Sequence, residues 1–95
     1  MSLEHLASEY ITSAEHVLGT MEMVEDRADL HVDNIKKVVE SARAYLEDAR
    51  YFKNEGKFEV SLTSVAYCEG LLDALRLLRA VKFEWPSRGK SEREK

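Results

Sequence analysis

The chain has 95 residues, which is enough for one hydrophobic core and too few for two. Apolar residues make up 44% of it and charged residues 34%, a balance that excludes an intrinsically disordered protein. Residues 76–95 hold seven Lys or Arg and three Glu, whereas the remainder holds seven Lys or Arg and fifteen Asp or Glu. An acidic body of this kind is a poor surface for phosphate groups, so nucleic-acid binding is expected nowhere except at the C-terminal tail.

Two further features bear on where the protein works. No apolar run approaches the roughly 18–20 residues that a membrane-spanning helix needs, and the N-terminus has neither the basic start nor the apolar stretch of a signal peptide. The single cysteine, Cys68, cannot form a disulfide within the chain and is typical of a reducing compartment. We therefore expect a cytoplasmic protein that does not contact a membrane.

The first helix is expected over residues 3–24. Apolar residues recur there at steps of three and four, which places them on one side of a helix. They are Leu3, Leu6, Tyr10, Ala14, Val17, Met21 and Val24. Ser2 is the expected N-cap, because its hydroxyl can accept a hydrogen bond from a free N–H of the first turn. After this helix the apolar stripe is lost, and Asp26 and Asp29 can cap the next one.

A second helix is expected over residues 30–55. Its apolar residues form a stripe that is bordered by charged side chains of both signs. The stripe consists of Ile35, Val38, Val39, Ala42, Tyr45, Leu46, Ala49 and Phe52. Gly56 follows, and glycine takes the left-handed C-cap conformation at no steric cost. A tight helical hairpin is therefore predicted.

The third helix is expected over residues 58–82 and to be the most buried of the three. Its apolar residues cover more than half of the circumference, which is wider than two partner helices need, and this excess indicates contact with a second copy of the chain or with another protein. Short turns between three helices predict an all-α, three-helix up-down-up bundle with a long hairpin between the second and third helices. The single helical domain then spans residues 1–83, and residues 84–95 are expected to form a flexible polar tail.

The clearest candidate for a ligand-binding site is a cluster of polar and aromatic residues on this hairpin. Folding about Gly56 brings Tyr45, Asp48 and Tyr67 to similar heights, with Asp73 further along the third helix. Acidic and phenolic groups on facing helices can bind a cation or form hydrogen bonds to a small ligand.

A structural role for the same residues is the alternative, and it is the one that general experience with buried polar groups favours. In this interpretation Asp48 accepts a hydrogen bond from a tyrosine hydroxyl, and Asp73 pairs with Arg76 one helical turn away. Gly70 then lets a neighbouring backbone or aromatic ring come close. Trp85, just before the chain turns wholly polar, is expected to dock onto a partner or cap the open end of the bundle.

No catalytic set, cofactor-binding motif or metal site is predicted. His5, Glu9 and His16 share one face of the first helix, but they are spread too widely to close on one metal ion. Cys68 occupies an apolar helix position, where a role in the core is expected rather than one as a nucleophile. The sequence also lacks a glycine-rich phosphate loop. We therefore predict a protein that is not an enzyme and that carries no cofactor.

The two helices of the hairpin carry a recognisable sequence pattern. It consists of YLEDARYF at residues 45–52, the turn glycine Gly56, and YCEGLLDA at residues 67–74. This pattern resembles the archaeal family known as domain of unknown function 357, over about residues 10–80. The sequence departs from the family at Cys68, where alanine is usual. The resemblance implies a small helical fold and a cytoplasmic setting, and it implies no established activity.

Two hypotheses for the function follow. The first is a non-catalytic helical interaction module that binds a second copy of itself or a protein partner through the third helix. The second is a domain that binds a small ligand, a nucleotide or a cation, through Tyr45, Asp48, Tyr67 and Asp73.

Overall fold

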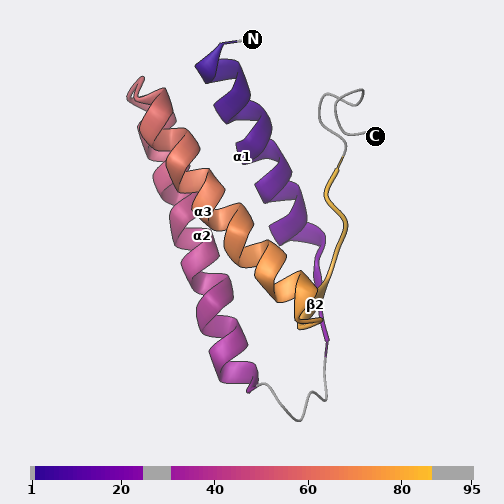
Figure 1. Cartoon of the computed structure of the whole chain (residues 1–95). Helices are drawn as coiled ribbons and strands as arrows, with labels where there is room; N and C mark the ends of the chain where they lie inside the picture. Colours follow the sequence, from indigo (N-terminus) through magenta and orange to yellow (C-terminus); the bar gives the residue numbers. More distant parts are fainter. Residues whose placement is uncertain (1, 25–30, 87–95) are drawn as a thin grey trace.

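Three helices make up the bundle. The computed structural model describes residues 2–24 and 31–86. Helix α1 spans Leu3–Thr20, α2 spans Val32–Asn54 and α3 spans Phe58–Leu77. Figure 1 shows each helix running antiparallel to the one before it, with α3 packed along α2 and against α1. The prediction of an all-α three-helix up-down-up bundle is confirmed.

Helix α1 begins where the sequence predicts and ends earlier. The hydroxyl of Ser2 accepts a hydrogen bond of 3.0 Å from the N–H of His5, so the predicted N-cap is confirmed. The helix ends at Thr20 instead of continuing to residue 24, because Met21 already has an extended backbone with φ −67° and ψ 151°. Glycine one residue before the end of the helix is consistent with this early stop.

The buried side of α1 is rotated relative to the predicted stripe. Ala7, Ile11 and Leu18 lie in the core, although the predicted stripe omits all three. Leu3, which the stripe includes, is 44% exposed. Because α1 packs against both α2 and α3, the groove between those two helices decides which side of α1 is covered.

Helix α3 ends five residues before the predicted boundary, at Leu77. The stop is a Schellman motif, in which the N–H of Ala80 donates to the carbonyl of Leu75 at 2.9 Å and the N–H of Arg79 donates to the carbonyl of Arg76 at 3.0 Å. Arg79 has φ 62°, the left-handed conformation that usually favours glycine. For a residue with a side chain this conformation costs about 1–2 kcal/mol.

A small antiparallel sheet replaces the predicted helix ends. Strand β1 (Glu22–Met23) pairs with strand β2 (Val81–Lys82), with Met23 opposite Val81. The N–H of Val24 extends the ladder by donating to the carbonyl of Ala80 at 3.0 Å. The helical prediction for these residues is wrong because α1 and α3 end at the same end of the bundle (Figure 1), where two extended segments satisfy each other's backbone groups.

Two clusters of buried residues form the core. The main cluster joins all three helices, and it consists of Ile11, Ala14, Val17, Leu18, Ala42, Leu46, Ala49, Val65, Cys68 and Leu72. The second cluster ties the sheet to the bundle, and it consists of Ile35, Leu75, Ala80 and Val81. The sheet is therefore part of the hydrophobic core and not an appendage.

The hairpin between α2 and α3 has the predicted turn. Gly56 has φ 78°, so the expected left-handed C-cap is present. Beyond the turn, the buried hydroxyl of Ser61 donates a hydrogen bond of 2.8 Å to the backbone carbonyl of Ala49 on α2. This bond crosses between the helices and fixes their relative height.

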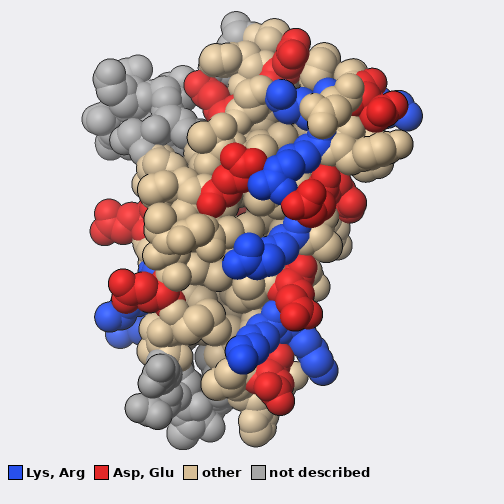
Figure 2. Space-filling view, turned by 180° about the vertical axis from the view of Figure 1, so that it is seen from behind, with Lys and Arg blue, Asp and Glu red and all other residues tan. Residues whose placement is uncertain are grey.

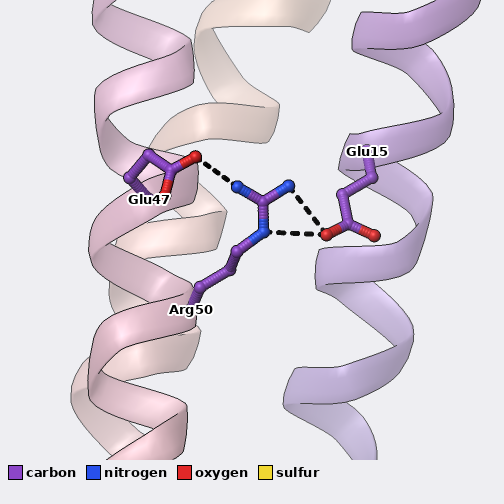
Figure 3. A network of polar contacts seen from close by, with 3 residues as sticks. All are labelled: Glu15, Glu47 and Arg50. Carbon is purple, nitrogen blue, oxygen red and sulfur yellow. Dashed lines mark hydrogen bonds and ion pairs between the residues drawn. The ribbon is translucent and has the colours of Figure 1, made fainter.

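An ion-pair network links the outer sides of α1 and α2. The Nε and Nη2 atoms of Arg50 each lie 2.8 Å from Oε2 of Glu15 on α1, and Nη1 contacts Glu47 one turn away on α2 (Figure 3). The hydrogen bond that Arg50 donates to Glu15 is the main cause that raises the pKa of Arg50. Since both partners of the pair between helices are more than a third exposed, its contribution to stability is small, typically below about 1 kcal/mol.

The chain beyond β2 runs back along the bundle rather than leaving it at once. Trp85, which the prediction placed in the polar tail, is partly buried against the main cluster together with Phe83. Residues 87–95 of the predicted tail lie outside the described residues, as do the predicted caps Asp26 and Asp29. Within the described parts of the chain, none of the helices is long and apolar enough to cross a membrane.

Candidate functional site

Two of the four predicted ligand-binding residues come together. Tyr45 on α2 and Tyr67 on α3 stack with ring centroids 5.2 Å apart and an interplanar angle of 24°. Tyr45 is partly buried, whereas Tyr67 is 59% exposed. The stacked pair shows that the predicted register of the hairpin is correct.

The two predicted carboxylates are separated from the tyrosine pair. Asp48 is exposed on α2, and no hydrogen bond or ion pair joins its side chain to residues 2–24 or 31–86. The expected bond from a tyrosine hydroxyl to Asp48 is therefore absent from this part of the chain. Asp73 has a different role, since its Oδ1 accepts hydrogen bonds from Nε of Arg76 at 3.2 Å and from Nε1 of Trp85 at 2.9 Å. The predicted Asp73–Arg76 pair is confirmed, and the carboxylate also fixes the indole of Trp85.

Gly70 does not have the close-packing role that the sequence suggests. It lies on the exposed side of α3, and a Cβ built on it meets nothing within 4 Å among the residues described. No neighbouring backbone or ring in these residues therefore requires a glycine. Its φ angle is also outside the left-handed region, so the backbone does not require one either.

A shallow pocket of about 360 Å³ lies beside Gly70, in the groove between α2 and α3. The residues around it carry no charge, and they are Val38, Ser41, Tyr45, Ala66, Tyr67, Gly70 and Leu71. Neither Asp48 nor Asp73 lines this pocket. The predicted four-residue site is therefore divided into an uncharged groove with the two tyrosines and two separate carboxylates.

The groove continues into a broad, largely apolar surface, which we call the outer face of α3 and which the exposed Glu59 borders in the first turn. It comprises Val60, Thr63, Ala66, Tyr67, Gly70, Ala74, Leu77 and Leu78, all of which are exposed. Among them, Val60 is 44% exposed, Leu77 71% and Leu78 53%. Helix α3 is therefore not enclosed as predicted. The excess apolar width seen in the sequence is real, and it faces outward.

Helix α2 presents the opposite kind of surface. Its exposed residues alternate in charge along the helix, and they include Lys36, Lys37, Glu40, Arg43 and Glu47. Figure 2, seen from behind, shows acidic and basic side chains in a column down that side of the molecule. A surface with paired charges is well solvated, whereas the polar groups on the outer face of α3 are two hydroxyls and, in the first turn, the carboxylate of Glu59.

The remaining reactive groups do not form a catalytic arrangement in the described residues. Burial raises the pKa of the Cys68 thiol to about 12, so the nucleophilic thiolate is scarce at neutral pH. His5 bonds Glu9 at 3.2 Å on the exposed side of α1. Across residues 2–24 and 31–86, no three His, Cys, Asp or Glu side chains gather in a metal-binding arrangement.

Comparison with known proteins places the chain in a family. The model of a family described as "Protein of unknown function (DUF357)" matches residues 5–81, which include α2, α3 and β1 in full, all but the first two residues of α1, and the first residue of β2. The chain belongs to this family. No curated protein and no solved structure matches it. The resemblance noted on the hairpin is thus confirmed for the family, which carries no established activity.

Proposed function

We propose that this domain is a non-catalytic interaction module of the cytoplasm, and that the outer face of α3 binds the same face of a second copy of the chain. The observation that supports this proposal is the outer face itself. It runs the length of α3, it is largely apolar, and its charged side chain, Glu59, lies in the first turn, away from the centre. Contiguous exposed surfaces of this kind mark interaction sites more often than they remain in water.

The size pattern of the outer face suits a helix packed against its own copy. Ala66, Gly70 and Ala74 follow one another at steps of four, so the smallest side chains lie in one row at the middle of α3. An antiparallel two-fold contact centred on Gly70 brings Ala66 of one copy opposite Ala74 of the other. The larger residues, Val60 and Leu78, then meet at the two ends. A partner of the same sequence therefore fits with the charge of Glu59 at the edge of the contact.

Gly70 is a second reason to expect that the α3 helices of two copies pack closely. A glycine in the middle of an exposed helix weakens that helix by about 0.8–1.0 kcal/mol relative to alanine. The described residues of one chain make no use of the space that it leaves. A second helix that crosses at Gly70 can use that space, because two backbones approach most closely where no Cβ stands between them.

The area available fits a weak dimer. Helix α3 has 20 residues and is about 30 Å long, and the neighbouring α2 lies about 8–10 Å to one side. The outer face and the adjoining groove together then offer about 600 Å² per copy. A standard stable interface buries about 800 Å² per partner, so we expect a dimer that dissociates in the micromolar range or above.

A charge placed in the centre of the outer face tests the proposal. Ala74→Lys should raise the dimer dissociation constant at least about tenfold, because the ammonium group loses water without gaining a partner. The control is Ala44→Lys, which adds the same charge to an exposed alanine of α2 on the side away from the core. Sedimentation velocity over a range of concentrations measures both. A wild-type chain that stays monomeric at millimolar concentration, or equal effects of the two variants, would count against the proposal.

The substitution Gly70→Ala is a second test, because it should stabilise the monomer and weaken the dimer. Gly70→Ala should raise the free energy of unfolding of the monomer by about 0.5–1 kcal/mol, since the added methyl group meets no atom in the described chain. The same methyl group should weaken the dimer several-fold by separating the two helices. Urea unfolding at low protein concentration measures the first effect and sedimentation the second. A more stable monomer with an unchanged dimer would move the contact away from Gly70.

A ligand-binding function remains the second candidate, because the groove beside the stacked Tyr45 and Tyr67 has room for a small planar group. A thermal-shift screen with nucleotides and divalent cations separates it from self-association. A shift that depends on Asp48 or Asp73 would restore the site predicted from the sequence. A shift lost only on replacing Tyr67 would place the ligand in the uncharged groove.

A further inference from the structure

A second pocket lies at the other end of α3, between the helix and the sheet. It has a volume of about 600 Å³, and its lining differs entirely from that of the groove. The lining residues are Val24, Arg76, Arg79, Val81, Lys82, Phe83 and Glu84. No residue of this pocket belongs to the outer face of α3. A function of the pocket is therefore independent of the proposed dimer.

The pocket combines positive charge with an apolar surface. Three of its residues, Arg76, Arg79 and Lys82, are cations, and Glu84 is its one carboxylate. This concentration of cations stands out in a chain whose net charge is −4. Arg and Lys together form the usual recognition set for carboxylate and phosphate groups. Of the remaining lining, Phe83 offers a ring face or edge to a planar ligand.

The positions of these groups are fixed by the fold. Phe83 meets Trp85 edge to face, with ring centroids 5.1 Å apart and an interplanar angle of 84°. Trp85 and Arg76 are both hydrogen-bonded to Oδ1 of Asp73, so one carboxylate holds a cation and an aromatic pair in place. Lys82 is anchored through the backbone pairing of β2 with β1.

The backbone conformation of Arg79 also draws attention to this pocket. It occupies the left-handed position of the Schellman motif, where glycine would be free of strain. A strained residue that persists is a reason to look for a role of its side chain. Here the strained backbone carries a guanidinium group at the edge of the pocket.

We propose that this pocket binds an organic anion with an apolar or aromatic body. The carboxylate or phosphate end of the ligand meets Arg79 and Lys82, and its body lies against Val24, Val81 and Phe83. Arg76 also lines the pocket, where its Nε donates a hydrogen bond to Asp73. Glu84 offsets part of the positive charge and favours ligands with a single charged end over more highly charged ones.

The test is an NMR titration of the full chain with four probes. 2-Naphthoate and 2-naphthyl phosphate carry the two kinds of anion, 2-naphthol lacks the charge, and inorganic phosphate lacks the apolar body. We expect saturable shifts of the backbone amides of residues 24 and 79–84 with one or both naphthyl anions. Binding of 2-naphthol and of inorganic phosphate should be at least about tenfold weaker. The first cannot pair with the cations of the pocket, and the second cannot contact its apolar residues. The naphthyl anion that binds more tightly identifies the anionic group.

Arg79→Gly separates binding from folding. This variant removes the guanidinium and also relieves the backbone, so its thermal midpoint should rise by a few degrees while the affinity for the naphthyl anion falls at least about fivefold. Lys82→Met should also weaken binding, and Lys37→Met, which removes an exposed lysine of α2, should not. Equal binding of 2-naphthol and 2-naphthoate, undiminished binding by Arg79→Gly, or shifts confined to the groove residues 38–45 would each overturn the proposal.

Discussion

Replacing Leu72 with alanine should lower the free energy of unfolding by about 3 kcal/mol, the largest change expected from any single truncation in this bundle. Leu72 is 0% exposed and is among the largest of the fully buried side chains described. It belongs to the cluster to which all three helices contribute, so no single helix can move to fill the cavity. For a domain of this size, such a loss is a large fraction of the total stability.

Leu77→Ala is the matched control for this prediction. The same side chain is removed from the same helix, but Leu77 is 71% exposed. The expected change in the free energy of unfolding is within about 0.5 kcal/mol. Urea unfolding followed by circular dichroism, at a protein concentration low enough to keep the chain monomeric, measures both variants. Similar losses in the two would show that the core is not where the structure places it.

The thiol of Cys68 should react with Ellman's reagent at pH 8 at least about a thousand times more slowly in the folded protein than in urea. The pKa of this thiol is raised to about 12, first by burial and then by the neighbouring carboxylate of Glu69. The thiolate fraction in the folded state is therefore on the order of one in ten thousand at that pH. Stopped-flow absorbance with and without urea gives the ratio, and rapid labelling of the folded chain would contradict the burial of Cys68.

Because the pKa of Cys68 is raised, the free energy of unfolding should also change with pH in the alkaline range. Below the ordinary thiol value of 9.0, Cys68 is protonated in both states and its contribution to stability is fully present. Between pH 9 and about 12 the unfolded chain loses this proton first, so the free energy of unfolding falls by up to about 1.4 kcal/mol per pH unit. The Cys68→Ala variant should lack the part of this pH dependence that comes from the thiol. The part that comes from the tyrosines and lysines should remain. Equal slopes in the two proteins would contradict the prediction.

The helices and the hairpin could be predicted from the sequence because the signals for them are local. The period of apolar residues in α2, the N-cap at Ser2 and the glycine at position 56 each act within a few residues. The ends of α1 and α3 could not be placed in the same way. They are set by pairing between β1 and β2, which are almost sixty residues apart and only two residues long.

The candidate sites, too, could be predicted only in part from the sequence. The register of the hairpin predicted that Tyr45 and Tyr67 would meet. The wide apolar surface of α3 was correctly recognised, but it led to the prediction that α3 is the most buried helix, whereas much of that surface is exposed. The distance between Asp48 and Asp73 along the helices already placed them apart. The pocket around Arg79 could not be predicted, because an arginine in a left-handed conformation has no sequence signature. The one signal for it was the excess of positive charge after residue 75.

The short sheet also sets the order in which the chain is expected to fold. Helices α2 and α3 are joined by a turn of three residues, so their contacts form with little loss of loop entropy. Strand β1 must instead find β2 across the whole length of the hairpin, and this pairing holds the end of α1 against the bundle. Docking of α1 and closure of the sheet should therefore be the late and slow step. In hydrogen exchange, the amide of Val24 should then report the opening of α1 from an α2–α3 hairpin that remains formed.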